Sequence, residues 1–251
     1  MRVHRLPLHG TNAYVISGDH HVLVDTGPER ARTTLLSALA SIGLGGEDLS
    51  LVLVTHAHAT AVGNAAYLQN VFHVPVAVHG SDAPVLASGV DRGVSITKPV
   101  GAVMRWLGDT RFDAPTPDVV FGHTLSLEPF GSPGTIVHTP GHTIGSASVV
   151  LPGGDAIIGD LLMGGFFGGR VWPTRPTHHY FAEVPQRIVR SLALLNRLGV
   201  QRLHPGTGEV LQMEEVRETI IARASGYDPG PMPTRRRERQ LRQEPAMYPA
   251  N

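Results

Sequence analysis

The chain has 251 residues, of which 21 are basic and 21 acidic, and it contains no cysteine. A chain of this length can bury a large core, and the absence of cysteine excludes disulfides, thiolate zinc sites and a cysteine nucleophile. The balanced charge provides no global field that would attract nucleic acid or an anionic membrane, so a small-molecule substrate is the expected partner.

The amino-terminal residues MRVHRLPLHG lack the apolar core of a secretion signal. No apolar run approaches the ~20 residues that a membrane span needs. We therefore expect a soluble, cytoplasmic protein.

Apolar patterns separated by Gly, Pro and Asp predict the elements of the first half of the chain. In order, they are strands 13–17 and 21–25, a helix 29–42, a strand 51–54, a helix 64–72, a strand 74–79, and short helices 83–87 and 100–107. The alternation of strands and helices indicates a sheet with helices packed on its face.

The second half begins with strands again, at 119–121, 124–127, 135–139, 147–151 and 156–159. Residues 161–176 are rich in glycine, so we expect an irregular loop that is either a lid or an ordinary surface crossing. A helix 184–198, a strand 202–204 and a helix 213–224 follow. From residue 227 the sequence is rich in proline and arginine. This composition predicts a disordered or loosely docked tail, 227–251, after a folded domain, 1–226.

Two histidines follow the continuous apolar run Leu51 to Val54, which is typical of a fully buried strand. His56 and His58 are two positions apart, so in an extended segment they point to the same side. Imidazole is the commonest metal ligand, and a shared metal is one interpretation of the pair. The other interpretation is that they are two ordinary histidines beside a strand.

Three further polar residues end predicted strands. His142 follows a turn that Pro140 and Gly141 impose, so it projects from a loop and supplies a third imidazole. Asp160 ends the strand AIIG in the same way. Asp25 ends the strand VLVD, where it either belongs to the same edge or caps the following helix, and both roles can hold together.

Four segments, DTG at 25–27, THAHATAVG at 55–63, TPGHTIGS at 139–146 and IIGDLL at 157–162, together resemble the metallo-β-lactamase superfamily, in particular its glyoxalase II-like and small hydrolase members. The resemblance extends over residues 6–224 and implies an α/β (α+β) fold, a four-layer αβ/βα sandwich with the site where strand-end loops meet. It also implies metal ligands and flanking structural residues. The ligands would be His56, His58, His142 and Asp160, and the flanking residues Asp25, Thr55 and Thr143.

The resemblance is incomplete at the second metal site of the family, whose usual motif is T-H-x-H-x-D-H-x-G. Thr60 and Ala61 stand where that motif has aspartate and histidine, and Thr207 stands where a late histidine belongs. The possible substitutes are His178, His179 and His204. We expect the pair His178 and His179 to face solvent and His204 to lie too far away. Because metal geometry is strict, we do not expect any of the three to restore the second site. About one zinc per chain is predicted, with iron or manganese as alternatives.

These residues predict a mononuclear zinc hydrolase that cleaves an ester, thioester or lactone, and a carrier- or CoA-linked acyl group is one such substrate. Three histidines and an open position are the catalytic zinc arrangement, which supplies a zinc-bound hydroxide near neutral pH. Asp160 would be the fourth ligand or the general base. The alternatives are a non-hydrolytic Lewis-acid enzyme, such as a dehydratase or cyclase in a biosynthetic pathway, and a catalytically inactive ligand-binding homologue.

Overall fold

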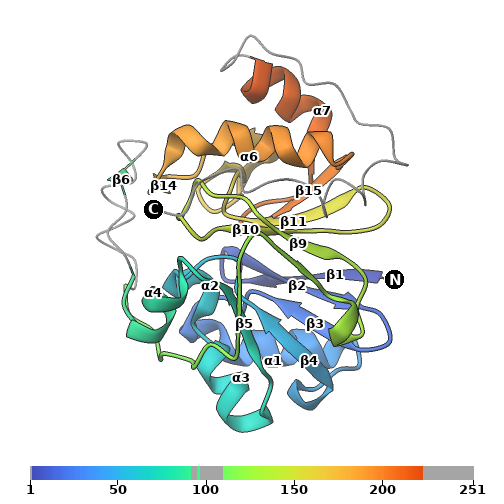
Figure 1. Ribbon diagram of the computed structural model, residues 1–251, viewed down its shortest axis with the longest axis vertical. Coiled ribbons are helices and arrows are strands. Elements are labelled where there is room, and N and C mark those ends of the chain that lie inside the picture. The colour runs from blue at the N-terminus through green and yellow to red at the C-terminus, as the bar shows by residue number, and fades with distance from the viewer. Residues whose placement is uncertain (1, 92–94, 97–109, 223–251) are drawn as a thin grey trace.

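The computed structural model describes residues 2–91, 95–96 and 110–222. In these residues two six-stranded sheets pack face to face, and helices cover both outer sides (Figure 1). The expected four-layer sandwich is confirmed. The predicted helix 100–107 and the predicted tail 227–251 lie outside the described residues.

The first sheet has the strand order β1-β2-β3-β4-β5-β7. Its strands are β1 (Arg2–Leu8), β2 (Thr11–Ser17), β3 (His21–Val24), β4 (Leu49–Leu53), β5 (Val76–His79) and β7 (Val119–Phe121). From β3 to β7 all pairs are parallel, so the carboxyl ends of these strands lie at one edge. The edge strand β1 was not predicted, because its short sequence mixes polar and apolar residues and contains a proline.

The second sheet has the order β16-β15-β11-β10-β9-β8. Its strands are β8 (Thr124–Ser126), β9 (Thr135–His138), β10 (Ala147–Val150), β11 (Asp155–Gly159), β15 (Arg202–Pro205) and β16 (Leu211–Gln212). The only parallel pair among them is β11 with β15. The predicted strands of this half are therefore confirmed within one or two residues at their ends.

The helices lie on the outer faces of the two sheets (Figure 1). Beside the first sheet are η1 (Glu29–Ala31), α1 (Arg32–Ser41), η2 (Gly46–Asp48), α2 (Ala59–Val62), α3 (Ala65–Phe72) and α4 (Ala83–Ser88). Beside the second are α6 (Pro185–Arg197) and α7 (Met213–Val216), which continues as the π-helical η4 (Arg217–Ile221), and η3 (Glu128–Phe130) follows β8. In the described part of the chain, no helix has the length and apolar character needed to cross a bilayer.

The central strand β4 is buried on both faces, which explains its continuous apolar run. Leu51 and Leu53 belong to the core between the two sheets, which also contains Ile136 and Val149 of the second sheet. Val52 instead belongs to the outer core beneath α1 and α3. The strand is thus held from both sides, and the loop that follows it starts from a rigid base.

The Gly-rich segment 161–176 is not an irregular loop, and that prediction is wrong. It forms most of a hairpin, β12 (Met163–Phe166) and β13 (Val171–Thr177), which pair antiparallel. Glycines at positive φ, including Gly165 in the strand and Gly168 in the turn, allow an irregular register and a tight reversal. Beyond it, β14 (Phe181–Ala182) pairs with β6 (Ser95–Ile96).

Gly159, at the end of β11, marks a close approach of the two sheets. It has a φ of 50°, and a Cβ added there would lie 2.4 Å from Thr55 Oγ1. We expect Gly159→Ala to lower the free energy of unfolding by about 1–3 kcal/mol, the usual cost of overpacking. Gly153→Ala is the control, since it also has a positive φ but nothing within 4 Å. Equal losses in denaturant titrations of the two variants would contradict the proposed clash.

Candidate metal centre

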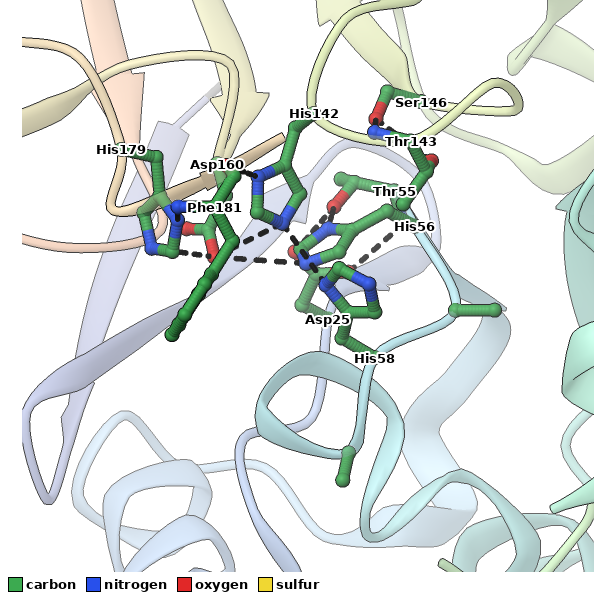
Figure 2. Close-up of polar contacts among 12 residues, drawn as sticks. Asp25, Thr55, His56, His58, His142, Thr143, Ser146, Asp160, His179 and Phe181 are labelled. Atoms are coloured by element: carbon green, nitrogen blue, oxygen red, sulfur yellow. Dashed lines mark hydrogen bonds and ion pairs between the residues drawn. The ribbon is translucent and has the colours of Figure 1, made fainter. Parts of the chain in front are cut away.

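Three histidines from both sheets meet at the edge where the strands end (Figure 2). His56 and His58 follow β4 of the first sheet, and His142 lies between β9 and β10 of the second. One ring nitrogen from each lies within 4.8 Å of the other two, and all three side chains are buried. His58 Nδ1 and His142 Nε2 are 2.9 Å apart. The geometry is that of a cluster able to hold one metal ion.

A chain of hydrogen bonds orients His56. Asp25 accepts bonds from the backbone N–H of Thr55 at 2.8 Å and from its hydroxyl at 2.7 Å. Because that hydroxyl proton is used, Thr55 Oγ1 accepts from His56 Nδ1 at 2.9 Å, and Nε2 faces the cluster. The interpretation of Asp25 as a helix cap is wrong, since the following helix η1 has no side-chain cap. Asp25 instead supports the first ligand loop.

His142 is oriented by a backbone carbonyl. Its Nδ1 lies 3.0 Å from the carbonyl oxygen of Phe181, which can only accept a hydrogen bond. The proton of neutral His142 is therefore on Nδ1, and Nε2 presents its lone pair to the cluster. The loop is further fixed by Thr143, whose backbone N–H donates to Ser146 Oγ at 2.8 Å.

Asp82, which sequence reasoning missed, ties the two ligand loops together. Its Oδ2 accepts from the backbone N–H of Ala57 at 3.1 Å and from Thr143 Oγ1 at 2.7 Å, and its Oδ1 accepts from Gly145 N–H at 3.0 Å. The side chain is only 1% exposed. Its position just after the end of the parallel strand β5 is the one signal that could have identified it.

Asp160 lies beside the cluster. Its Oδ2 is 3.5 Å from His56 Nε2 and 3.8 Å from His142 Nε2. It is also 3.4 Å from Nε2 of His179, and His142, Asp160 and His179 form a second group whose ligand atoms lie within 4.8 Å of one another. Asp160 therefore faces three imidazoles.

The expectation that both loop histidines face solvent is wrong for His179, although His178 is exposed. The reason is the unexpected strand β13: burial alternates from Thr177 through His178 to His179, as it does along a strand. His204 is not at the cluster, because its Nε2 bonds Asp155 Oδ1 at 2.8 Å.

The positions that depart from the family pattern carry no substitute ligand. Ala61 is buried in the outer core of the first sheet, and its carbonyl oxygen accepts a hydrogen bond from the backbone N–H of Thr26. Thr60 is half-buried on α2. Thr207 is buried in a turn next to Asp160. The turn is close to that side chain, because a Cβ added at the preceding Gly206 would lie 2.5 Å from Asp160 Oδ1. Neither hydroxyl provides the charge of an aspartate or the lone pair of an imidazole.

The electrostatics of the site fit a cation. Burial and the neighbouring imidazoles hold the pKa of His142 well below its usual value, so this ring is neutral as a ligand must be. Burial raises the pKa of Asp160, but His179 and His56 outweigh it and lower the pKa well below the usual range. Among the described residues, the buried Nε2 of His56 makes no hydrogen bond. A divalent metal at the three histidines would satisfy that nitrogen, and a histidine and carboxylate set suits zinc, iron or manganese.

Asp82→Asn tests the link between the loops. An amide keeps the size of the side chain but has only one oxygen acceptor. Either Ala57 and Thr143 lose their shared acceptor, or Gly145 loses its own. We expect metal affinity to fall by about 10- to 100-fold, as for residues that orient ligands. Calorimetric titration with zinc measures it. Asp118→Asn is the control, because Asp118 accepts from Val76 N–H at the opposite end of β5. An equal loss of affinity in both variants would contradict the role of Asp82.

Metal binding should depend on pH through His56. Burial lowers its pKa, but the carboxylates of Asp160, Asp25 and Asp82 outweigh burial and raise it to about 9. The metal must displace this proton, so below pH 9 the affinity should rise with pH by about tenfold per unit. Calorimetry in buffers of different ionisation enthalpy counts the released protons. A constant affinity between pH 6.5 and 8.5 would contradict this displacement.

Comparison with known proteins agrees with the fold. The model of the metallo-beta-lactamase superfamily matches residues 6–205. A probable metallo-hydrolase of Methanocaldococcus jannaschii is 25% identical over 206 residues, which cover 80% of this chain and 89% of the relative. The probable metallo-hydrolase YqgX of Bacillus subtilis is 26% identical over 170 residues, covering 64% of this chain and 70% of the relative.

Solved structures show the same architecture. A metallo-beta-lactamase family protein from Thermus thermophilus superposes with a TM-score of 0.65 at 24% identity, covering 89% of this chain and 79% of that one. TTHA1623, whose crystal structure is of a di-iron-bound form, has a TM-score of 0.60 at 27% identity and covers 83% of this chain and 93% of its own. With the histidine cluster at the strand ends, these matches lead to one conclusion: the chain belongs to the metallo-β-lactamase superfamily.

Proposed function

We propose that the protein is a hydrolase with about one zinc per chain, and that it cleaves an ester, thioester or lactone of a small molecule. The observation that carries the proposal is the cluster of three buried histidine nitrogens, all within 4.8 Å of one another, with Asp160 beside it. The hydrolase class is supported by the probable metallo-hydrolases to which the chain is similar. The single metal is supported by the residues at positions 60, 61 and 207.

Different residues of the site would have different roles in such a reaction. His56, His58 and His142 would hold the metal, and Thr55 and the carbonyl of Phe181 keep two of these rings in the required tautomer. A bound divalent ion supplies a Lewis acid that polarises a carbonyl and brings the pKa of water to about 7. Asp160 stays ionised at neutral pH, so it can accept a hydrogen bond from the attacking water and orient it.

The substrate class follows from the number of metals. Cleavage of a phosphodiester is commonly supported by two ions that stabilise the attacking and leaving oxygens together. A single ion suits the transfer of an acyl group to water from a good leaving group, such as a thiol or an activated alcohol. Carrier- or CoA-linked acyl groups belong to this class.

A screen of purified protein with ester, thioester, lactone and phosphodiester substrates, with and without added zinc, tests the proposal. We expect zinc-dependent turnover of one or more acyl substrates. Oxygen from water enriched in the heavy isotope should appear in the product, because hydrolysis incorporates solvent oxygen. Turnover of phosphodiesters alone would contradict the proposal, and a product without solvent oxygen would indicate the non-hydrolytic Lewis-acid alternative.

Variants locate the activity in the histidine cluster. His142→Ala removes one of three ligands, so both bound zinc and turnover should be lost. His204→Ala is the matched control, because His204 bonds Asp155 and lies outside the cluster, and its zinc content should equal that of the unaltered protein. Metal analysis after dialysis should find about one zinc per chain. Two tightly held equivalents would contradict the mononuclear site.

A further inference from the structure

The backbone of one residue, Phe181, contacts two histidines of the site in opposite ways (Figure 2). Its carbonyl oxygen lies 3.0 Å from Nδ1 of His142 and accepts the proton of that nitrogen. Its N–H donates to Nδ1 of His179 at 3.3 Å. A nitrogen that accepts a hydrogen bond carries no proton, so the proton of neutral His179 is on Nε2. The two rings therefore have different tautomers.

The tautomers assign different tasks to the two rings. Nε2 of His142 carries no hydrogen, and its lone pair points into the three-histidine cluster, as a ligand requires. Nε2 of His179 carries a hydrogen and lies 3.4 Å from Oδ2 of Asp160, a carboxylate oxygen that can accept it. A metal ligand needs a lone pair at the atom that faces the ion. In this arrangement His179 presents a hydrogen there.

We propose that His179 is a hydrogen-bond donor to the substrate's carbonyl oxygen and not a metal ligand. This role rests on the acyl hydrolysis proposed above. The acyl group must lie next to the three-histidine cluster to react. A ring nitrogen of His179 lies within 4.8 Å of the ligand atoms of both His142 and Asp160, and its Nε2 is 3.4 Å from Asp160 Oδ2. The side chain is 13% exposed, so it borders the site without being sealed from the substrate.

The reaction balances without a proton transfer at His179. The oxygen of water adds to the acyl carbon, one water proton passes to Asp160, and negative charge develops on the carbonyl oxygen. When the carbonyl forms again, the bond to the leaving oxygen or sulfur breaks, and the leaving atom takes the proton from Asp160. The Nε2–H faces Asp160 in the free protein. Once Asp160 has taken the water proton it is a weaker acceptor, and the N–H donates to the carbonyl oxygen and stabilises its developing charge. Loss of one such donor commonly lowers turnover by about 10²–10³-fold.

Nuclear magnetic resonance of protein labelled with ¹⁵N in histidine tests the tautomer directly. We expect His179 to have a proton on Nε2 and none on Nδ1, both in the metal-free protein and after loading with zinc. His179→Gln identifies the signal by its loss, and His178→Gln, at the exposed neighbouring position, is the control. Disappearance of the Nε2 proton when zinc is added would overturn the proposal, because it would make His179 a ligand.

Zinc binding and kinetics separate donor, ligand and structural roles. His179→Ala should leave the zinc content and affinity unchanged and lower kcat/KM by about 10²–10³-fold. His179→Gln should recover most of that loss, because its amide N–H lies near the position of Nε2. Loss of zinc in both variants would overturn the donor role in favour of a ligand. A lower unfolding midpoint in both, without recovery by glutamine, would overturn it in favour of a structural role.

The two proposals fail in different ways. If the unaltered protein hydrolyses no acyl substrate, the proposed function fails, and the tautomer and the zinc affinity of the His179 variants still decide between donor and ligand. If the protein hydrolyses acyl substrates and His179→Ala retains full kcat/KM, the proposed function stands and the role of His179 is overturned.

Discussion

Apolar packing between the two sheets is the constraint on which the metal centre depends. His56 and His58 belong to one sheet and His142 to the other, so their nitrogens meet only if the sheets keep a fixed separation. Fully buried side chains such as Leu51, Leu53, Ile136 and Val149 fill the space between them. Each contributes on the order of 1.5–3 kcal/mol on burial, and close packing leaves little freedom to shift. The core therefore acts on the site by setting where its loops begin.

Three buried carboxylates, which accept hydrogen bonds or face imidazoles, then fix the side chains and loops that the core positions. Asp25 acts through Thr55 on His56, and Asp82 joins the two ligand loops. Asp160 faces the imidazoles directly. Burial of several carboxylates is costly unless hydrogen bonds or positive charge compensate for it. Burial raises the pKa of Asp25 to about 6, even though His56 and Thr55 act against it. A bound cation would relieve this accumulation of negative charge.

The positions that differ from the family pattern are those of its second metal site. Thr60, Ala61 and Thr207 supply no aspartate or histidine there, and the groups that lie beside the three-histidine cluster are Asp160 and His179. The β12–β13 hairpin leads into His179, which lies beside Asp160, and the backbone N–H of Phe181 donates to that ring. In the role proposed above, His179 is a hydrogen-bond donor beside the cluster. With the proposed single metal, such a site would keep the Lewis-acid chemistry of one ion and gain a polar contact for substrate.

The sequence by itself determined the family, the order of most strands and helices, and the loops that carry His56, His58, His142 and Asp160. It could do so because these features depend on local patterns: apolar runs that end abruptly, tight turns, and short motifs in a fixed order. Asp25 was also predicted correctly at the end of its strand, although its hydrogen bonds with Thr55 were not predicted.

Only the tertiary structure decided which distant groups meet. The contact of Asp82 with Ala57, Thr143 and Gly145 joins segments from different sheets, so no local pattern reveals it. The hairpin after Leu162 was hidden because its glycines are poor strand formers, and pairing between strands overrides that propensity. With the hairpin hidden, the alternation that turns His179 inward was hidden too. The roles of these side chains depend on hydrogen-bond partners far away in the chain, and folding alone selects those partners.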